Sequence, residues 1–260
     1  MTDLILALDQ GTTSSRSILF TEKAEIRAVA SEPLECRFPD SGWVEQDAEA
    51  IWETQRSTIV KVLDQAGIGL SEVSAIGITN QRESTIAWNR ETGEALCPAI
   101  NWQCRRTAGF CDELKEEGFD ELIRNRTGLV TDPYFSGTKM HWILQNVPEA
   151  ANLARQGKLC FGTVDSWLIW KLSGGTTHAI EISNASRTLV FDIQKCEWDS
   201  EILSRFGIPA ESLPEVVPSS GVITEVDESL FGGSAPIAGA AGDQQAALFG
   251  QACFSPGMVK

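Results

Sequence analysis

LILALDQGTTSSR, residues 4–16, is the stretch that decides the fold. Residues 4–8 are all apolar, and a single carboxylate, Asp9, follows them directly. An apolar run this short that ends in turn-forming residues favours a buried strand over a helix. Residues 17–20 would form a second strand, so the two strands would make a hairpin with Gly11 in its turn.

The polar turn of this hairpin has two interpretations. Asp9, where the first strand emerges, can face solvent or a bound cation, and the hydroxyls and backbone N–H groups of residues 12–15 can surround a phosphate group. An ordinary hairpin whose turn contains an aspartate fits the same stretch, because such turns are common. Taken alone, residues 4–16 leave both interpretations open.

The composition excludes several classes of protein. The 260 residues, 42% apolar and 22% charged, are typical of a globular protein with an ample core. The net charge of -15 argues against nucleic acid or an anionic membrane as the main partner. Because the apolar runs are too short to span a bilayer and the N-terminus does not resemble a signal peptide, we predict a cytoplasmic protein without membrane insertion.

The cysteines give no sign of a metal site. There are seven, none of them in a Cys-x-x-Cys pair, and the chain has only two histidines. A structural zinc site is therefore not expected. Reduced thiols in a cytosolic protein are the simplest account.

The first half of the chain predicts a mixed α/β sheet. A third strand is expected at residues 25–30, then a helix that Asp47 caps and Gly67 ends. A buried strand at 73–78 follows, and the segment 85–88 either pairs with it or follows it. This order of elements opens the ribonuclease-H-like fold of the actin, hexokinase and Hsp70 type, a mixed sheet with flanking helices and helical insertions.

The second half of the chain is mainly helical. Helices are expected after Arg105 with a stop at Gly118, from a cap at Asp120 to Gly128, over 138–144, and from a cap at Asp165 to Gly174. Residues 236–239 would form a last strand, 239–243 a glycine-rich turn, and 245–250 a helix. Ligands of open α/β sheets gather at the carboxyl ends of strands, so Asp9 and Arg82-Glu83 could face one cleft.

Asp243 is the candidate for proton transfer. It lies in the glycine-rich turn at the start of a helix, where a plain N-cap is the simplest structural role. The functional alternative is a general base that accepts the proton of a substrate hydroxyl as its oxygen attacks phosphorus. Gln244 adds a neutral donor and acceptor for another hydroxyl.

Two further groups could hold a polyol. Arg82 can donate to vicinal hydroxyls while Glu83 accepts from them, although a rim ion pair of little energetic value is the structural alternative. Trp102 and Tyr134, the only tyrosine, offer flat apolar faces. Core packing is the default role for either ring.

Taken together, these stretches resemble the FGGY carbohydrate kinase family, and within it the members that phosphorylate glycerol. The motifs that carry the resemblance cover the whole chain in the family's order: residues 8–16, 42–45, 77–83, 102–107, 132–139, 161–168, 184–188 and 242–250. One Asp-Gln-Gly-Thr motif would be weak, whereas this ordered series is specific.

The resemblance implies ATP-dependent phosphorylation of glycerol to sn-glycerol 3-phosphate. It places the nucleotide phosphates on Thr12, Thr13, Ser14 and Arg16, and assigns Asp9 to Mg²⁺. It implies that glycerol is held by Arg82, Glu83, Trp102, Tyr134, Asp243 and Gln244, with Asp243 as the base. A kinase for another polyol or sugar, or a non-enzymatic actin-like nucleotide-binding scaffold, are the alternatives.

The family also has a second, adenosine-binding domain of similar length. The resemblance therefore implies that residues 1–250 are an N-terminal domain that binds glycerol and phosphate, and that 251–260 begin the connection to the second domain. Glycerol and ATP are the expected partners, and we expect the full-length protein to be a homo-oligomer. Activity of these 260 residues alone is not expected.

Overall fold

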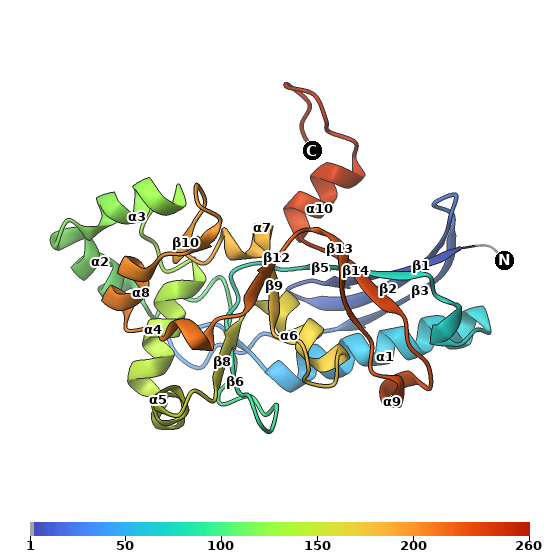
Figure 1. Ribbon diagram of the computed structural model, residues 1–260, viewed down its shortest axis with the longest axis horizontal. Helices are drawn as coiled ribbons and strands as arrows, with labels where there is room; N and C mark the ends of the chain where they lie inside the picture. Colours follow the sequence, from blue (N-terminus) through green and yellow to red (C-terminus); the bar gives the residue numbers. More distant parts are fainter. Residues whose placement is uncertain (1–2) are drawn as a thin grey trace.

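The computed structural model, which describes residues 3–260, is built on a six-stranded mixed sheet (Figure 1). In sheet order the strands are β13 (Ser220–Glu225), β14 (Pro236–Gly242), β5 (Ala75–Asn80), β1 (Leu4–Gln10), β2 (Ser14–Thr21) and β3 (Ile26–Pro33). The pairs β1–β5 and β5–β14 are parallel, and the other neighbours are antiparallel. The predicted mixed sheet is confirmed.

The hairpin of β1 and β2 forms as predicted, with Asp9 opposite Arg16 in its register. Leu4, Leu6 and Leu8 are buried. Because successive side chains of a strand point to opposite faces, Asp9 lies on the other, less buried face of β1. The alternation of buried and less buried side chains in residues 4–10 thus decides which face of the sheet carries the Asp9 carboxylate.

Two helices cover one face of the sheet. Helix α1 (Ala48–Ala66) packs on β1, β2 and β3, and α6 (Val164–Leu172) packs on β5 and β14. The limits of α1 are those predicted: Asp47 accepts hydrogen bonds from two backbone N–H groups of the first turn, and Gly67 adopts the left-handed conformation at φ 66°. Its buried stripe includes Ile51, Ile59 and Val62.

A helical region lies beside the sheet, on the left of Figure 1. Its helices are α2 (Ala108–Glu116), α3 (Phe119–Thr127), α4 (Ser136–Asn146), α5 (Pro148–Arg155) and α8 (Ser200–Phe206). It has its own apolar core, which includes Met140, Ile143 and Phe206. These helices are the helical insertions expected from the sequence.

Short elements connect the two regions and complete the chain. They are β4 (Glu45–Gln46), β6 (Ile86–Asn89), β7 (Ala99–Ile100), β8 (Leu159–Gly162), β9 (Ala179–Glu181), α7 (Ile182–Ala185), β10 (Phe191–Asp192), β11 (Glu197–Trp198), β12 (Glu215–Val217), α9 (Glu228–Phe231), α10 (Asp243–Gly250) and two single-turn helices, Leu70–Glu72 and Ala210–Ser212. Strand β6 pairs with β8 and not with β5, which settles the alternatives left open for residues 85–88. Helix α10 projects away from the sheet (Figure 1).

Three local predictions were wrong. Gly118, not Asp120, precedes α3, and Asp120 lies in its first turn. Asp165 lies inside α6, where it is fully buried and accepts hydrogen bonds from the Thr163 hydroxyl and the Glu181 backbone N–H. Residues 239–242 continue strand β14 and do not form a turn. Tertiary contacts account for two of the three: Glu181 bonds Asp165, and residues 239–242 pair with β5.

No helix within residues 3–260 combines the length and the apolar character that crossing a bilayer requires.

His178 gives the fold a specific pH dependence. Its ring packs against Trp88 at a centroid distance of 5.1 Å, and its Nε2 donates to the Phe161 carbonyl at 2.8 Å. Burial lowers the pKa of His178 from 6.5 to about 4. The unfolded chain therefore takes up this proton at a higher pH than the folded chain, and the contribution of His178 to stability falls as the pH drops below 6.5 towards 4.

We expect this group to remove about 2 kcal/mol from the free energy of unfolding between about pH 6.5 and about pH 5. Denaturant unfolding at several pH values should show a shallower acid loss in His178→Gln than in the unsubstituted protein. His141→Gln, at the only other histidine, is the control. Parallel pH curves for the unsubstituted protein and His178→Gln would contradict the assignment.

Candidate active site

The carboxyl ends of three adjacent parallel strands meet at one edge of the sheet. Asp9 lies near the end of β1, Arg82 and Glu83 follow β5, and Asp243 follows β14. Beside them is a cavity of about 100 Å³, lined by Thr12, Gln81, Arg82, Glu83, Trp102, Tyr134, Asp243 and Gln244. All six side chains predicted to hold a polyol therefore line one cavity, together with Thr12 of the hairpin.

Asp243 is placed by the junction of β14 and α10. It is the first residue of α10 and not its N-cap, which is Gly242. One carboxylate oxygen lies 3.3 Å from Arg82 Nε. The Arg82 side chain is almost fully buried, whereas Asp243 is about half exposed to the cavity side. The carboxylate is therefore oriented by a fixed cation and remains accessible to a ligand.

Gly242 is required at this junction. A Cβ atom at this position would lie 2.4 Å from Arg82 Cδ, which is closer than any real contact. Its backbone N–H donates to the Ser183 hydroxyl at 3.0 Å. The close approach of the β14 backbone to Arg82 thus needs glycine, and it is what brings Asp243 within reach of the arginine.

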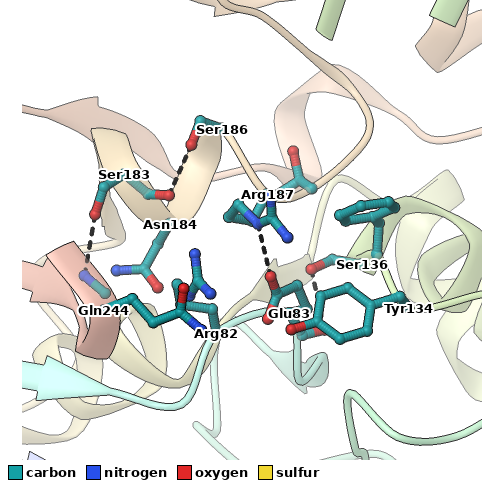
Figure 2. Close-up of polar contacts among 12 residues, drawn as sticks. Arg82, Glu83, Tyr134, Ser136, Ser183, Asn184, Ser186, Arg187 and Gln244 are labelled. Carbon is teal, nitrogen blue, oxygen red and sulfur yellow. Dashed lines mark hydrogen bonds and ion pairs between the residues drawn. The ribbon is translucent and has the colours of Figure 1, made fainter. Parts of the chain in front are cut away.

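Glu83 adopts a left-handed backbone conformation, with φ of 62°. Such a conformation is uncommon for a residue with a side chain and is often found at functional sites. Three donors bind its carbonyl oxygen: the Ser136 hydroxyl at 3.1 Å, the Thr85 hydroxyl at 3.2 Å and Lys139 Nζ at 3.4 Å. Arg187 Nε donates to the carboxylate at 2.7 Å, as Figure 2 shows.

The charge of Glu83 is set by opposing effects. Burial raises the pKa of its carboxyl group, while the hydrogen bond from Arg187 and the positive charges of Arg82, Arg187 and Lys139 lower it. The net shift is upward. Three cations surrounding one buried carboxylate offset much of the cost of burying its charge.

Lys139 and Arg187 are site residues that sequence reasoning missed. Lys139 is fully buried and also donates to the Phe135 carbonyl at 3.3 Å. Burial lowers its pKa to about 7, although the charge of Glu83 opposes this shift. Both residues occur in the motifs quoted above, but only their tertiary contacts to Glu83 give them a role.

The two aromatic residues face the cavity. Trp102 and Tyr134 pack edge to face with ring centroids 5.6 Å apart. The indole N–H of Trp102 donates to the Thr12 hydroxyl at 2.9 Å. Both rings are half-buried rather than part of the core, so they leave apolar surface available to a ligand. The contact to Thr12 ties this aromatic wall to the hairpin.

The hairpin lies next to the cavity, held by side-chain amides. Gln46 Nε2 donates to the Thr12 carbonyl at 2.8 Å, and Gln81 Nε2 donates to the Gly11 carbonyl at 3.2 Å. Thr13 is exposed and Ser14 is half-buried. Ser15 is fully buried and bonded to Gln10, so its hydroxyl is not available to a ligand.

Asp9 and Arg16 form the outer part of the hairpin. Arg16 lies 4.0 Å from the Asp9 carboxylate. Burial raises the pKa of Asp9, the charge of Arg16 opposes this shift, and the charge of Asp243 adds to it. The geometric link between the hairpin and the cavity is Thr12, which lines the cavity and accepts the hydrogen bond from Trp102.

The residues at the hairpin fit a metal ion that a single carboxylate, Asp9, would bind together with waters and the phosphates of a bound substrate. Within residues 3–260 no group of three or more His, Cys, Asp or Glu side chains could hold a metal ion by itself. Mg²⁺ is usually bound by one or two carboxylates, several waters and the phosphates of a substrate. Asp9, partly exposed beside the hydroxyl-rich turn, meets that requirement.

The strand order and the position of the cavity define the ribonuclease-H-like class, which includes the sugar kinases. The model of the FGGY family of carbohydrate kinases, N-terminal domain, matches residues 4–250. The chain belongs to this family.

Two similar proteins are glycerol kinases. The chain is 55% identical to a glycerol kinase of Carboxydothermus hydrogenoformans over 257 residues, which are 98% of this chain and 51% of that protein. It is 55% identical to glycerol kinase 2 of Thermotoga maritima over 256 residues, 98% of this chain and 52% of the relative. The chain thus spans about half the length of these relatives.

Two solved structures of kinases superpose on this chain. The structure of Plasmodium falciparum glycerol kinase with ADP superposes with a TM-score of 0.92 at 32% identity, covering 98% of this chain and 51% of the other. The xylulose kinase of Rhodospirillum rubrum gives a TM-score of 0.87 at 23% identity, covering 98% and 52%. The second likeness concerns the fold alone.

Proposed function

We propose that the protein phosphorylates glycerol to sn-glycerol 3-phosphate with ATP as the phosphoryl donor. The observation that carries this proposal is the cavity of about 100 Å³ in which Arg82, Glu83, Trp102, Tyr134, Asp243 and Gln244 meet. The cavity is small, and its charged pair and two aromatic rings suit the hydroxyls and short carbon skeleton of a three-carbon triol better than a six-carbon sugar. The similarity to glycerol kinases supports the same substrate.

In the proposed reaction Asp243 accepts the proton of a terminal hydroxyl. The hydroxyl oxygen forms a bond to the γ-phosphorus, and the bond between that phosphorus and the bridging oxygen breaks, which releases ADP. Arg82 and Glu83 hold the other hydroxyls, and the Trp102 ring lies against the carbon skeleton. Gln244 contributes a further hydrogen bond from the start of α10.

The hairpin is proposed to hold the phosphates. Thr12, Thr13, Ser14 and Arg16 would contact the nucleotide phosphates, and Asp9 would bind Mg²⁺, which neutralises charge on the phosphates when bound. Thr12 lines the cavity and its hydroxyl bonds to Trp102, so phosphate and polyol would lie on either side of one side chain.

We further propose that residues 1–250 form the glycerol- and phosphate-binding domain and that 251–260 begin a connection to an adenosine-binding domain. The match of the chain to about half of each glycerol kinase supports this division. Seven free thiols support a reducing, cytoplasmic environment. Assembly into a homo-oligomer stays a prediction.

Glycerol binding tests the proposal directly. Calorimetry on the complete natural chain should give a glycerol Kd within the usual range of enzyme KM values, about 1 μM to about 1 mM. We expect Glu83→Gln to weaken binding at least about tenfold, because an amide accepts a weaker hydrogen bond than a carboxylate. Glu117→Gln, on an exposed ion pair with Arg205, is the control.

The two alternative functions predict different results when calorimetry is combined with an assay of phosphoryl transfer. Heat with xylulose or gluconate but none with glycerol would indicate a kinase for another polyol. Binding of ATP without phosphoryl transfer to any of these compounds would favour the nucleotide-binding scaffold. Either outcome would overturn the proposed reaction.

A further inference from the structure

Arg187 contacts Glu83 from a distant part of the chain. It follows α7, and its Nε lies 2.7 Å from Oε1 of Glu83. The Glu83 side chain is only 2% exposed and that of Arg187 is 25% exposed. Figure 2 shows the guanidinium beside the Glu83 carboxylate, with the dashed line of the hydrogen bond between them. A charge-assisted hydrogen bond of this length, mostly removed from water, fixes the orientation of the carboxylate.

The two oxygens of the Glu83 carboxylate differ in their partners. Oε1 accepts the hydrogen bond from Arg187, whereas Oε2 accepts none from any residue that the structure describes. Because Glu83 lines the cavity, Oε2 is the oxygen left for a ligand. A carboxylate can accept at both oxygens, so this division leaves half of its capacity to the cavity.

Arg187 is itself held in place by aromatic rings. Its guanidinium carbon lies 4.9 Å from the centroid of Phe135 and 5.7 Å from that of Tyr134. A guanidinium over an aromatic face gains cation–π stabilisation, which is larger when the group is partly desolvated. Tyr134 also lines the cavity, so one arginine contacts two of its walls.

We propose that Arg187 is a positioning residue for polyol binding: it occupies Oε1 of Glu83 and so presents Oε2 to a substrate hydroxyl. This inference rests on the proposed function, in which Glu83 accepts a hydroxyl of glycerol. Through this contact Arg187 sets the affinity for the polyol without touching it. The left-handed backbone of Glu83, held by Ser136 and Lys139 at the carbonyl, fixes the other end of the same residue.

The contact predicts a distinct pH dependence. The charged and titratable groups that face Glu83 are Arg82, Arg187, Lys139 and Tyr134. Burial already raises the pKa of Glu83, so loss of Arg187 should raise that pKa further. Binding through a carboxylate requires its ionised form, which is lost as the pH falls through the pKa. Without Arg187, polyol binding should therefore begin to weaken at a higher pH.

Two variants test the proposal in the complete natural chain. In Arg187→Met we expect the glycerol Kd to rise about 10- to 100-fold at neutral pH, and its acid limb to move to higher pH. Arg187→Lys keeps the charge and should recover part of the loss. Arg205→Met is the matched control, because Arg205 also pairs with a glutamate at 2.7 Å, is 29% exposed and lies over an aromatic ring, Phe110.

A measurement without substrate separates this inference from the proposed function. Carbon-13 NMR of labelled glutamate carboxyl groups should show the Glu83 resonance titrating at higher pH in Arg187→Met than in the unsubstituted protein. An unchanged titration would overturn the positioning role. A shifted titration in a protein that binds no glycerol would support the contact but overturn the proposed substrate. If Arg187→Met lost the same affinity for glycerol at every pH, Arg187 would have only a structural role, and the proposal would also be overturned.

Discussion

Asp243→Asn is expected to lower turnover by about 10²- to 10⁴-fold, the usual contribution of a general base, with little change in glycerol affinity. The amide has the shape of the carboxylate and keeps an oxygen towards Arg82, whose Nε lies 3.3 Å from the carboxylate. An amide cannot accept the hydroxyl proton in the transition state. The loss should therefore appear in kcat and not in the glycerol Kd.

Steady-state kinetics and calorimetry on the complete natural chain measure the two quantities separately. Asp112→Asn is a suitable control, since Asp112 is an exposed residue of α2 that forms an ion pair with Lys115. A variant at position 243 with full turnover would show that another group accepts the proton. A parallel loss of affinity and turnover would instead assign Asp243 to ground-state binding.

The sequence predicts those parts of the fold that are determined by local preference. The limits of α1 follow from a side-chain cap at Asp47 and a left-handed Gly67, both of which act within one turn. The hairpin of β1 and β2 follows from an apolar run and a polar turn. The rule that ligands gather at the ends of parallel strands predicts one cleft for Asp9 and Arg82-Glu83; Arg82 and Glu83 line the cavity, whereas Asp9 does not.

The sequence does not predict contacts between segments that are far apart. Arg187 and Glu83 are 104 positions apart, and the Lys139 contact to Glu83 spans 56. A charged residue within a helical pattern usually indicates a solvated face, yet Lys139 is fully buried. Asp165 was predicted to be a cap, but it is buried inside α6 and accepts a hydrogen bond from the backbone N–H of Glu181, 16 positions away.

Gly137→Ala should reduce the free energy of unfolding by about 1–3 kcal/mol, the usual cost of overpacking. Gly137 lies in the first turn of α4, where its N–H donates to the Thr188 carbonyl at 2.6 Å. A Cβ atom here would lie 2.7 Å from that backbone oxygen and 2.8 Å from Val190 Cγ1. The oxygen belongs to the backbone and cannot rotate away, so α4 and residues 187–190 must move apart.

Denaturant unfolding of Gly137→Ala and Gly109→Ala compares two helical glycines of opposite surroundings. A Cβ at Gly109, in α2, meets nothing within 4 Å, and alanine there should stabilise the protein by about 0.5–1 kcal/mol through helix propensity. Equal stability changes at the two positions would contradict the close packing of α4. The displaced segment carries Arg187, so Gly137→Ala should also weaken glycerol binding, whereas Gly109→Ala should leave it unchanged. The packing of α4 on this segment would then link the stability of the helical region to the orientation of Glu83.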